Sequence, residues 1–152
     1  MNAALASAAV VVRRTIAASA EDLFDAWLDP HALATWMRPG TILGTVAKVE
    51  PHEGGSYEIT MMGESGPIVH KGVYRRIDRA RRLVFTWESP HTGPGETLVT
   101  VDFLPVDKRS DLRTEVVVTH EQLPESARAA HSSGWTSGLE HLDQACTQGL
   151  LK

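Results

Sequence analysis

Histidine is the side chain of this sequence best suited to acid–base or metal chemistry, and it occurs seven times in 152 residues. No pair of these histidines forms the H-E-x-x-H pattern, in which two histidines one helical turn apart bind zinc. His131 and His141 are ten residues apart, which places them on different faces of a helix. The spacing therefore predicts no metal site, and hydrogen-bonded or solvent-exposed histidines are expected instead.

Serine and cysteine nucleophiles are not indicated either. The sequence has no G-x-S-x-G elbow, and its single cysteine, Cys146, falls on an apolar helical stripe, where it is expected to be a small buried hydrophobic residue. The glycine-rich segments 53–56 (EGGS) and 91–96 (HTGPGE) lie between predicted strands, whereas a phosphate-binding loop opens a helix. These patterns predict no cofactor.

Apolar and polar residues alternate along several segments, so that each segment presents one mostly apolar face. Tyr57, Trp87 and Trp135 each carry a polar atom that needs a partner when buried, and His120 ends an otherwise apolar row. Apolar walls with a few polar groups are typical of a small-molecule pocket, and a solid core produces the same alternation. The rows are Tyr57/Ile59/Met61, Leu83/Phe85/Trp87, Val99/Val101/Phe103 and Val116/Val118/His120.

The elements that must position these residues follow from periodicity. Residues 9–17 predict a strand, followed by two short helices, the first capped by Ser19 and the second by Asp29 with Pro30 at its first position. From residue 44 the period is two, and the connections, the last at 107–111, are too short for crossover helices, so neighbouring strands must be antiparallel. The predicted strands are 44–51, 56–63, 68–78, 82–89, 96–106 and 114–123.

A helical pattern returns after residue 126 and predicts one stripe along a helix of about 20 residues. The stripe consists of Ala127, His131, Trp135, Gly138, Leu142 and Cys146. It needs a surface to bury it, and a twisted antiparallel sheet supplies one, which predicts an α+β domain whose sheet wraps round the last helix. Gly134 and Gly138 lower helix propensity and indicate close approach to the sheet or a bend.

Three of the histidines differ in how firmly the pattern places them. His131 lies on the stripe one turn before Trp135 and is expected at a cavity mouth, whereas His141 is expected to be solvated. The orientation of His70 stays open, because Val69, Val73 and Ile77 form a competing apolar row in the same strand.

The amino-acid composition limits the kind of protein that this sequence can form. Hydrophobic residues make up 42% of the chain and charged residues 22%, with a formal charge of -4, which fits one globular domain over residues 1–152 and no nucleic-acid partner. The basic segment 75–82 (RRIDRARR) is expected to be a solvated turn. A lone cysteine fits a reducing compartment, and no window reaches the ~18 apolar residues of a membrane span, so a cytoplasmic protein without membrane insertion is expected.

Several segments, in their order and spacing, resemble the activator of Hsp-90 ATPase homologue-like branch of the START-related SRPBCC superfamily. The resemblance implies a helix-grip fold, in which a curved antiparallel sheet of six or seven strands holds the long last helix, with two small helices at the mouth of an intervening cavity. The matching segments are 14–37 (RTIAASAEDLFDAWLDPHALATWM), 53–59 (EGGSYEI), 71–78 (KGVYRRID), 82–87 (RLVFTW), 97–103 (TLVTVDF), 114–124 (TEVVVTHEQLP) and 134–142 (GWTSGLEHL).

Members of the superfamily bind hydrophobic or amphipathic molecules in that cavity, and some are cyclases, hydrolases or resistance proteins. The co-chaperone that gives the family its name carries an additional domain for the chaperone contact, which argues against a chaperone partner for this chain. By position, the resemblance implies that nine residues face the cavity, to which His70 and His131 are added from the strand and helix patterns. The nine are Trp36, Met37, Tyr57, Ile59, Met61, Phe85, Trp87, His120 and Trp135.

Three functions stay open at this point. The first is a non-catalytic carrier or sensor for a small hydrophobic molecule. The second is a cyclase or hydrolase that uses His120 or His70 as general acid or base, with Glu58 or Glu88 nearby. The third is a protein-interaction module, in chaperone regulation or as a homodimer, that uses edge strands or the surface of the two short helices.

Overall fold

The computed structural model of the protein describes residues 9–106 and 113–149. In this part of the chain, three helices and one seven-stranded antiparallel sheet of order β1-β7-β6-β5-β4-β3-β2 form the predicted helix-grip fold, which is thereby confirmed. The predicted turn at 107–111 lies outside the described residues. The elements are β1 (Val10–Ile16), α2 (Ala20–Leu28), α3 (Pro30–Trp36), β2 (Gly44–Val49), β3 (Ser56–Gly63), β4 (Gly66–Asp78), β5 (Arg82–Trp87), β6 (Thr97–Pro105), β7 (Thr114–Glu121) and α4 (Glu125–Thr147).

The two short helices begin at the predicted caps. The Ser19 hydroxyl accepts a hydrogen bond from the Asp22 N–H at 3.1 Å, and the Asp29 carboxylate accepts one from the His31 N–H at 2.9 Å, with Pro30 at the first helical position. Each cap satisfies a backbone donor that the first turn of a helix leaves free. The chain can therefore stop α2 and start α3 within one residue.

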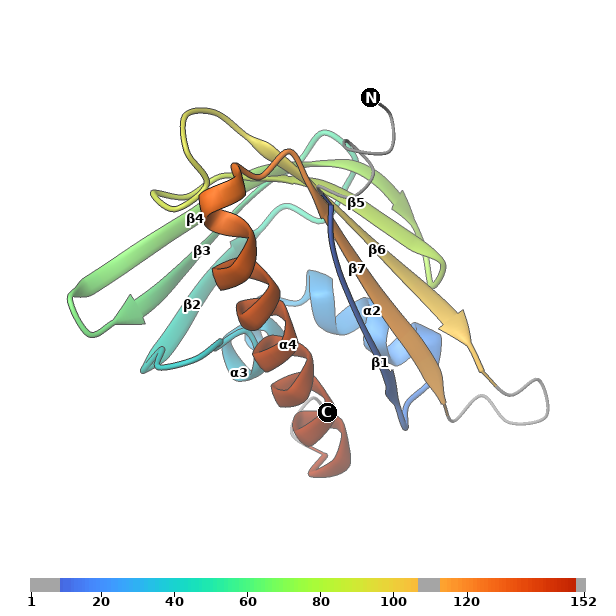
Figure 1. Ribbon diagram of the computed structural model, residues 1–152. Coiled ribbons are helices and arrows are strands. Elements are labelled where there is room, and N and C mark those ends of the chain that lie inside the picture. The colour runs from blue at the N-terminus through green and yellow to red at the C-terminus, as the bar shows by residue number, and fades with distance from the viewer. Residues whose placement is uncertain (1–8, 107–112, 150–152) are drawn as a thin grey trace.

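Aromatic side chains of α2 and α3 fill one half of the space inside the sheet. The Trp27 and Trp36 rings meet edge to face with centroids 4.7 Å apart, and Phe24 contacts Phe103 of β6 at 5.2 Å. Figure 1 shows α2 and α3 lying between the two arms of the bent sheet, with α4 running along its concave side. The small helices therefore occupy the interior beside the C-terminal half of α4.

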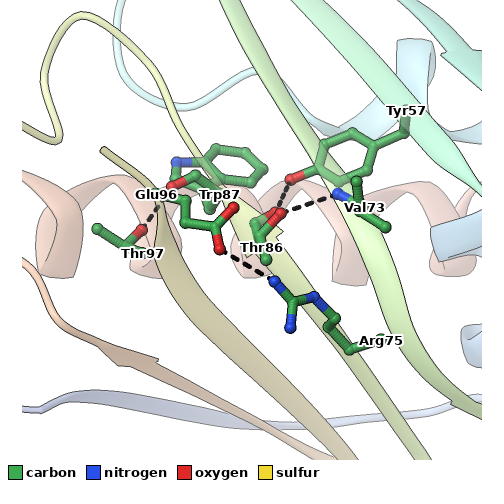
Figure 2. Close-up of polar contacts among 7 residues, drawn as sticks. All are labelled: Tyr57, Val73, Arg75, Thr86, Trp87, Glu96 and Thr97. Carbon is green, nitrogen blue, oxygen red and sulfur yellow. Dashed lines mark hydrogen bonds and ion pairs between the residues drawn. The ribbon is translucent and has the colours of Figure 1, made fainter. Parts of the chain in front are cut away.

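The sheet bends where β4 and β5 separate. Val73 N–H donates to the Thr86 Oγ1 at 2.8 Å, and the Tyr57 hydroxyl donates to the Thr86 carbonyl, so side chains join the strands here (Figure 2). Gly72 lies at this point because a Cβ there would collide with the Thr86 carbonyl. A β-bulge between Tyr74 and the next paired residue of β4 follows directly and increases the curvature.

The stripe on α4 is buried largely as predicted. Ala127, Trp135, Gly138 and Leu142 are buried, whereas His131 and Cys146 are only half-buried. Two buried residues were not included in the predicted stripe, Leu139 and Ala145. They widen the apolar face because α4 packs against α3 as well as against the sheet.

The two glycines of α4 approach α3 and the segment after it, so the first of the two predicted reasons for them, close approach to the sheet, is wrong. A Cβ on Gly138 would lie 3.8 Å from Trp36 Cζ3, and one on Gly134 would lie 3.8 Å from Pro39 Cβ. The backbone is tied there as well, because the Gly40 N–H donates to the Ser137 hydroxyl at 3.0 Å. The C-terminal end of α3 is thus held against the middle of α4.

Candidate functional site: a cavity beside α4

A cavity of about 160 Å³ lies between the sheet and the N-terminal half of α4. We call it the α4 cavity, and it is lined by Met37, Pro39, Met61, His70, Trp87, Ser89, His91, Ala130, His131, Gly134 and Trp135. An engineered cavity of ~150 Å³ in another protein binds benzene, so this volume suits a single aromatic ring.

The neighbouring interior is closed. The void next to Trp27, Tyr57 and Phe85 measures only about 10 Å³, too little for more than a water molecule. The aromatic side chains of α2 and α3 fill that part of the space, and no helix fills the part beside residues 130–135. The position of the α4 cavity thus follows from where the small helices end.

The structure brings six of the eleven predicted ligand-binding residues to this cavity and places the other five elsewhere. Trp36, Tyr57, Ile59 and Phe85 are core residues, and His120 lies behind the cavity wall. Trp36 is fully buried, and its Nε1–H donates to the Ala26 carbonyl at 3.0 Å, so its burial leaves no polar atom of the ring unpaired. The six that line the cavity are Met37, Met61, His70, Trp87, His131 and Trp135.

Five lining residues were missed by the sequence analysis. Ser89 and His91 come from the connection between β5 and β6, which has no periodic pattern, and Pro39 comes from the segment after α3. Ala130 and Gly134 precede His131 and Trp135 in the helix, so a search of the stripe's immediate neighbours would have found them.

His120 is fully buried and both of its ring nitrogens are occupied. The Trp135 Nε1–H donates to His120 Nδ1 at 3.0 Å, and the Thr97 hydroxyl donates to the Trp87 carbonyl at 2.6 Å. Since the hydroxyl hydrogen is used, the 2.7 Å contact between Thr97 Oγ1 and His120 Nε2 has His120 as the donor. The hydrogen bonds therefore fix the neutral tautomer with its proton on Nε2.

Protonation of this histidine would break the Trp135 bond, because a charged imidazole has no acceptor. Burial, and then the charge of nearby His131, lowers the pKa of His120 to about 3. The residue predicted as a general acid or base is therefore a structural link between β6, β7 and α4, with no free nitrogen to offer a substrate.

His70 faces inward, which settles the orientation that the sequence left open. It is 8% exposed, whereas Val69 and Val73 of the competing row are 39% and 36% exposed on the other face. Its Nδ1 lies 3.3 Å from the Ile59 carbonyl, to which it donates. Burial lowers the pKa of His70 to about 4, against the opposing effect of the backbone carbonyls, so the ring is neutral at physiological pH.

His131 stands at the helix side of the cavity with one nitrogen fixed. Its Nδ1–H donates to the Ala127 carbonyl at 2.8 Å, one turn earlier in α4. Burial lowers its pKa, and the Ala127 carbonyl opposes that shift. His141, which was expected to be solvated, is instead half-buried, and its Nδ1 is sealed from solvent without a partner.

The carboxylates predicted to assist a histidine lie on the other face of the sheet. Glu58 and Glu88 line an outer groove of about 600 Å³ and face Lys71 across the strands. Strand alternation puts them opposite His70, because neighbouring residues of a strand point to opposite faces. The groove is larger than the α4 cavity, yet six of its twelve lining residues are Lys or Glu, which suits water better than an apolar ligand.

Four of the five arginines of the basic segment 75–82 pair with carboxylates. Arg75 pairs with Glu96 at 3.0 Å, as Figure 2 shows, and Arg79 pairs with Asp25 at 2.8 Å. Arg82 likewise pairs with a carboxylate of β6. These exposed pairs contribute little to stability, and they leave no concentrated positive patch for phosphates.

Two tests for other kinds of site are negative for the described residues. Over 9–106 and 113–149, no three or more His, Cys, Asp or Glu side chains are grouped so as to bind a metal ion. None of the helices described here is long and apolar enough to span a membrane.

Comparison with known proteins places the fold in a defined group. The family model described as "Activator of Hsp90 ATPase homolog 1-like protein" matches residues 17–147. A search of curated proteins finds no match.

Solved structures agree with this match. A Rhodobacter sphaeroides protein is 26% identical with a TM-score of 0.79, over 93% of this chain and 94% of its own. A Chromobacterium violaceum protein is 23% identical with a TM-score of 0.76, over 90% and 95%. An HSP90 activator from Plasmodium falciparum is 23% identical with a TM-score of 0.61, over 92% and 88%. The last two likenesses show the fold alone.

Proposed function

The chain belongs to the family of Activator of Hsp90 ATPase homolog 1-like proteins, and from that premise we propose that it is a carrier or sensor that binds a small hydrophobic or amphipathic molecule in the α4 cavity. One observation carries the proposal. About 160 Å³ stays open among aromatic and methionine side chains, while the adjoining core is packed to a void of about 10 Å³. Packed interiors rarely keep an apolar space of that size without a use for it.

The arrangement of polar groups favours binding over catalysis. His120 has both nitrogens engaged inside the protein, and the candidate carboxylates lie across the sheet from His70. An acid–base mechanism of the predicted kind needs a free nitrogen, which His120 lacks, and a carboxylate beside the base, which His70 lacks. Apolar contact is therefore the main source of affinity that this cavity offers a ligand.

Binding can be measured from the quenching of tryptophan fluorescence, since Trp87 and Trp135 both line the cavity. We expect toluene and benzene, which each have a single ring, to quench saturably in the native protein. Phenylalanine in place of Ala130, an exposed lining residue, should obstruct the cavity and abolish quenching. The matched control is Ala129→Phe, because Ala129 is exposed on the same helix and does not line the cavity.

Either of two binding results would contradict the proposal. If neither probe binds the native protein, or if Ala129→Phe and Ala130→Phe reduce quenching to the same extent, the α4 cavity is not a binding site. Circular dichroism of both variants would establish that α4 is intact.

Two accompanying predictions from the sequence extend this proposal. We propose that residues 1–152 act as one domain in the cytoplasm, and that a homodimer is compatible with ligand binding. Strand β2 is an edge of the sheet and exposes Val46 at 62%, next to Leu43 at 74%, which is the kind of edge that pairs with a second copy. The molar mass in solution, with and without Val46→Lys, tests the dimer.

A further inference from the structure

The hydrogen-bonding state of His131 limits what a ligand of the α4 cavity can be. Its Nδ1–H is donated to the Ala127 carbonyl at 2.8 Å. A neutral imidazole has one donor and one acceptor nitrogen, so Nε2 is an acceptor. Among the described residues no group bonds this Nε2, and it is not one of the polar atoms sealed from solvent. His131 therefore offers a ligand of the α4 cavity a hydrogen-bond acceptor, its Nε2.

His70 lines the cavity from β4, and two backbone groups, those of Ile59 and Ile68, interact with its ring. Its Nδ1 donates to the Ile59 carbonyl at 3.3 Å, and both histidines line the cavity. Among the described residues the two imidazoles are not hydrogen-bonded to each other, and His131 is the one whose ring has a single backbone partner.

The remaining walls favour a flat ring. The Trp87 and Trp135 centroids are 5.2 Å apart with their planes at 52°, so that they form an angled aromatic surface. Met37 and Met61 add thioether sulfurs, which make favourable contacts with aromatic rings. The volume of about 160 Å³ limits the ligand to one ring and a small substituent.

Charge excludes a class of otherwise suitable ligands. Among the described residues no Lys or Arg lines the cavity, and burial lowers the pKa of two of its three histidines, His70 and His131, so these two rings are not cations at neutral pH. A carboxylate entering the cavity would lose its hydration without gaining a counter-charge.

We propose that the ligand of the α4 cavity is an uncharged, single-ring hydroxy-aromatic compound of the phenol type, whose hydroxyl donates to His131 Nε2 while its ring lies against Trp87 and Trp135. This inference rests on the proposed function and names the ligand class for the same site. The acceptor nitrogen of His131 selects a donor, the tryptophan and methionine side chains select an aromatic ring, and a wall without Lys or Arg disfavours an acid.

Phenol, toluene and benzoate test each element, because they share one ring and differ in one substituent. Isothermal titration calorimetry at pH 7.5 should show binding of phenol and toluene and none of benzoate. In His131→Leu, phenol should bind about fivefold or more weakly, which is the worth of one hydrogen bond, while toluene keeps its affinity within about twofold. His131→Gln, which retains an acceptor oxygen, should recover part of the phenol affinity.

The control for folding is His141→Leu, a half-buried histidine of the same helix that does not line the cavity. It should bind phenol and toluene as the native protein does. Three results overturn the inference and leave the proposed function in place: toluene binds and phenol does not, benzoate binds more tightly than phenol, or His131→Leu weakens phenol and toluene equally. If none of the three compounds binds, the proposed function fails and the ligand class with it.

Discussion

Replacement of His120 by glutamine should make the protein less sensitive to acid. The native ring accepts from Trp135 Nε1 and donates to Thr97 Oγ1. A glutamine amide carries an acceptor oxygen and a donor nitrogen, so it can keep both bonds, and it does not titrate. The variant therefore separates the hydrogen bonds of His120 from its ability to bind a proton.

The size of the effect follows from the difference in pKa between the folded and unfolded chain. An unfolded histidine has a pKa of about 6.5, and burial lowers that of native His120 to about 3. Between these two values the unfolded state binds a proton that the folded state does not, so stability is complete above pH 6.5 and is lost as the pH falls toward 3. At pH 5.0 this single histidine costs about 2 kcal/mol of unfolding free energy.

The assay is urea unfolding, followed by tryptophan fluorescence and circular dichroism, at pH 7.5 and 5.0. At pH 7.5 we expect His120→Gln to lose about 1 kcal/mol through imperfect geometry. Between pH 7.5 and 5.0 the variant should lose about 2 kcal/mol less than the native protein. His70 and His131 titrate in both proteins, so their contributions cancel in the difference.

A second substitution separates the two causes. His120→Leu also removes the titration, but it leaves the buried Trp135 Nε1–H without an acceptor, which costs about 1–3 kcal/mol at every pH. If native protein and His120→Gln lose the same free energy on acidification, His120 is not a buried neutral histidine and the tautomer assigned above is wrong.

Three further predictions concern backbone crowding, a buried hydroxyl and the single cysteine. Gly72→Ala should destabilise the protein by about 3 kcal/mol or more, because the added Cβ collides with the Thr86 carbonyl. Gly134→Ala should be neutral or stabilise the protein by up to ~1 kcal/mol. Thermal unfolding measures both variants, and equal effects would contradict the crowding at Gly72. Tyr57→Phe should cost about 1–2 kcal/mol in urea unfolding, because the Thr86 carbonyl loses a donor, and no loss would mean that water replaces the hydroxyl. Burial raises the pKa of the half-buried Cys146 thiol to about 11. Because the thiolate is the reactive form, iodoacetamide should modify Cys146 slowly in the folded protein at pH 7.5 and quickly in urea. Equal rates would refute its burial.

The sequence predicted the fold well because each element carries its own local signal. The caps at Ser19 and Asp29 mark the helix starts, and strict alternation marks which residues of β3 and β5 face inward. Those signals depend on neighbours within a few residues of each other, so one sequence suffices to read them. The overall arrangement then followed from the resemblance to the family.

The candidate site was predicted less completely, for a physical reason. Alternation shows that Tyr57 and Phe85 face inward, but it does not show whether another side chain already occupies the space before them. Trp27 does so in this protein, with its ring 6.3 Å from that of Phe85. The inward orientation of a side chain depends on its own strand. An open cavity depends on how closely the sheet, the small helices and α4, which are distant in the sequence, pack together.

His120 illustrates the same limit for chemistry. A histidine at the end of an apolar strand is compatible with a base, a metal ligand or a buried link, and the sequence around it does not choose. The choice is made by Trp135, fifteen residues away, and Thr97, twenty-three residues away. A titratable residue becomes available to a ligand only when its own protein leaves a nitrogen unused.

Two buried tryptophan nitrogens that lack a hydrogen-bond partner distinguish the packed core from the α4 cavity. Trp27 and Trp87 both bury an Nε1–H without a partner, which costs free energy in each case. Trp27 lies against the closed void, so no ligand can reach it, and its ring contacts with Trp36 and Phe103 must outweigh that cost. Trp87 lies at the α4 cavity beside His70, with ring centroids 5.0 Å apart. Of these two tryptophans, Trp87 is therefore the one whose unsatisfied donor a small side-chain shift can bring to a bound molecule, and the one that a ligand can stabilise.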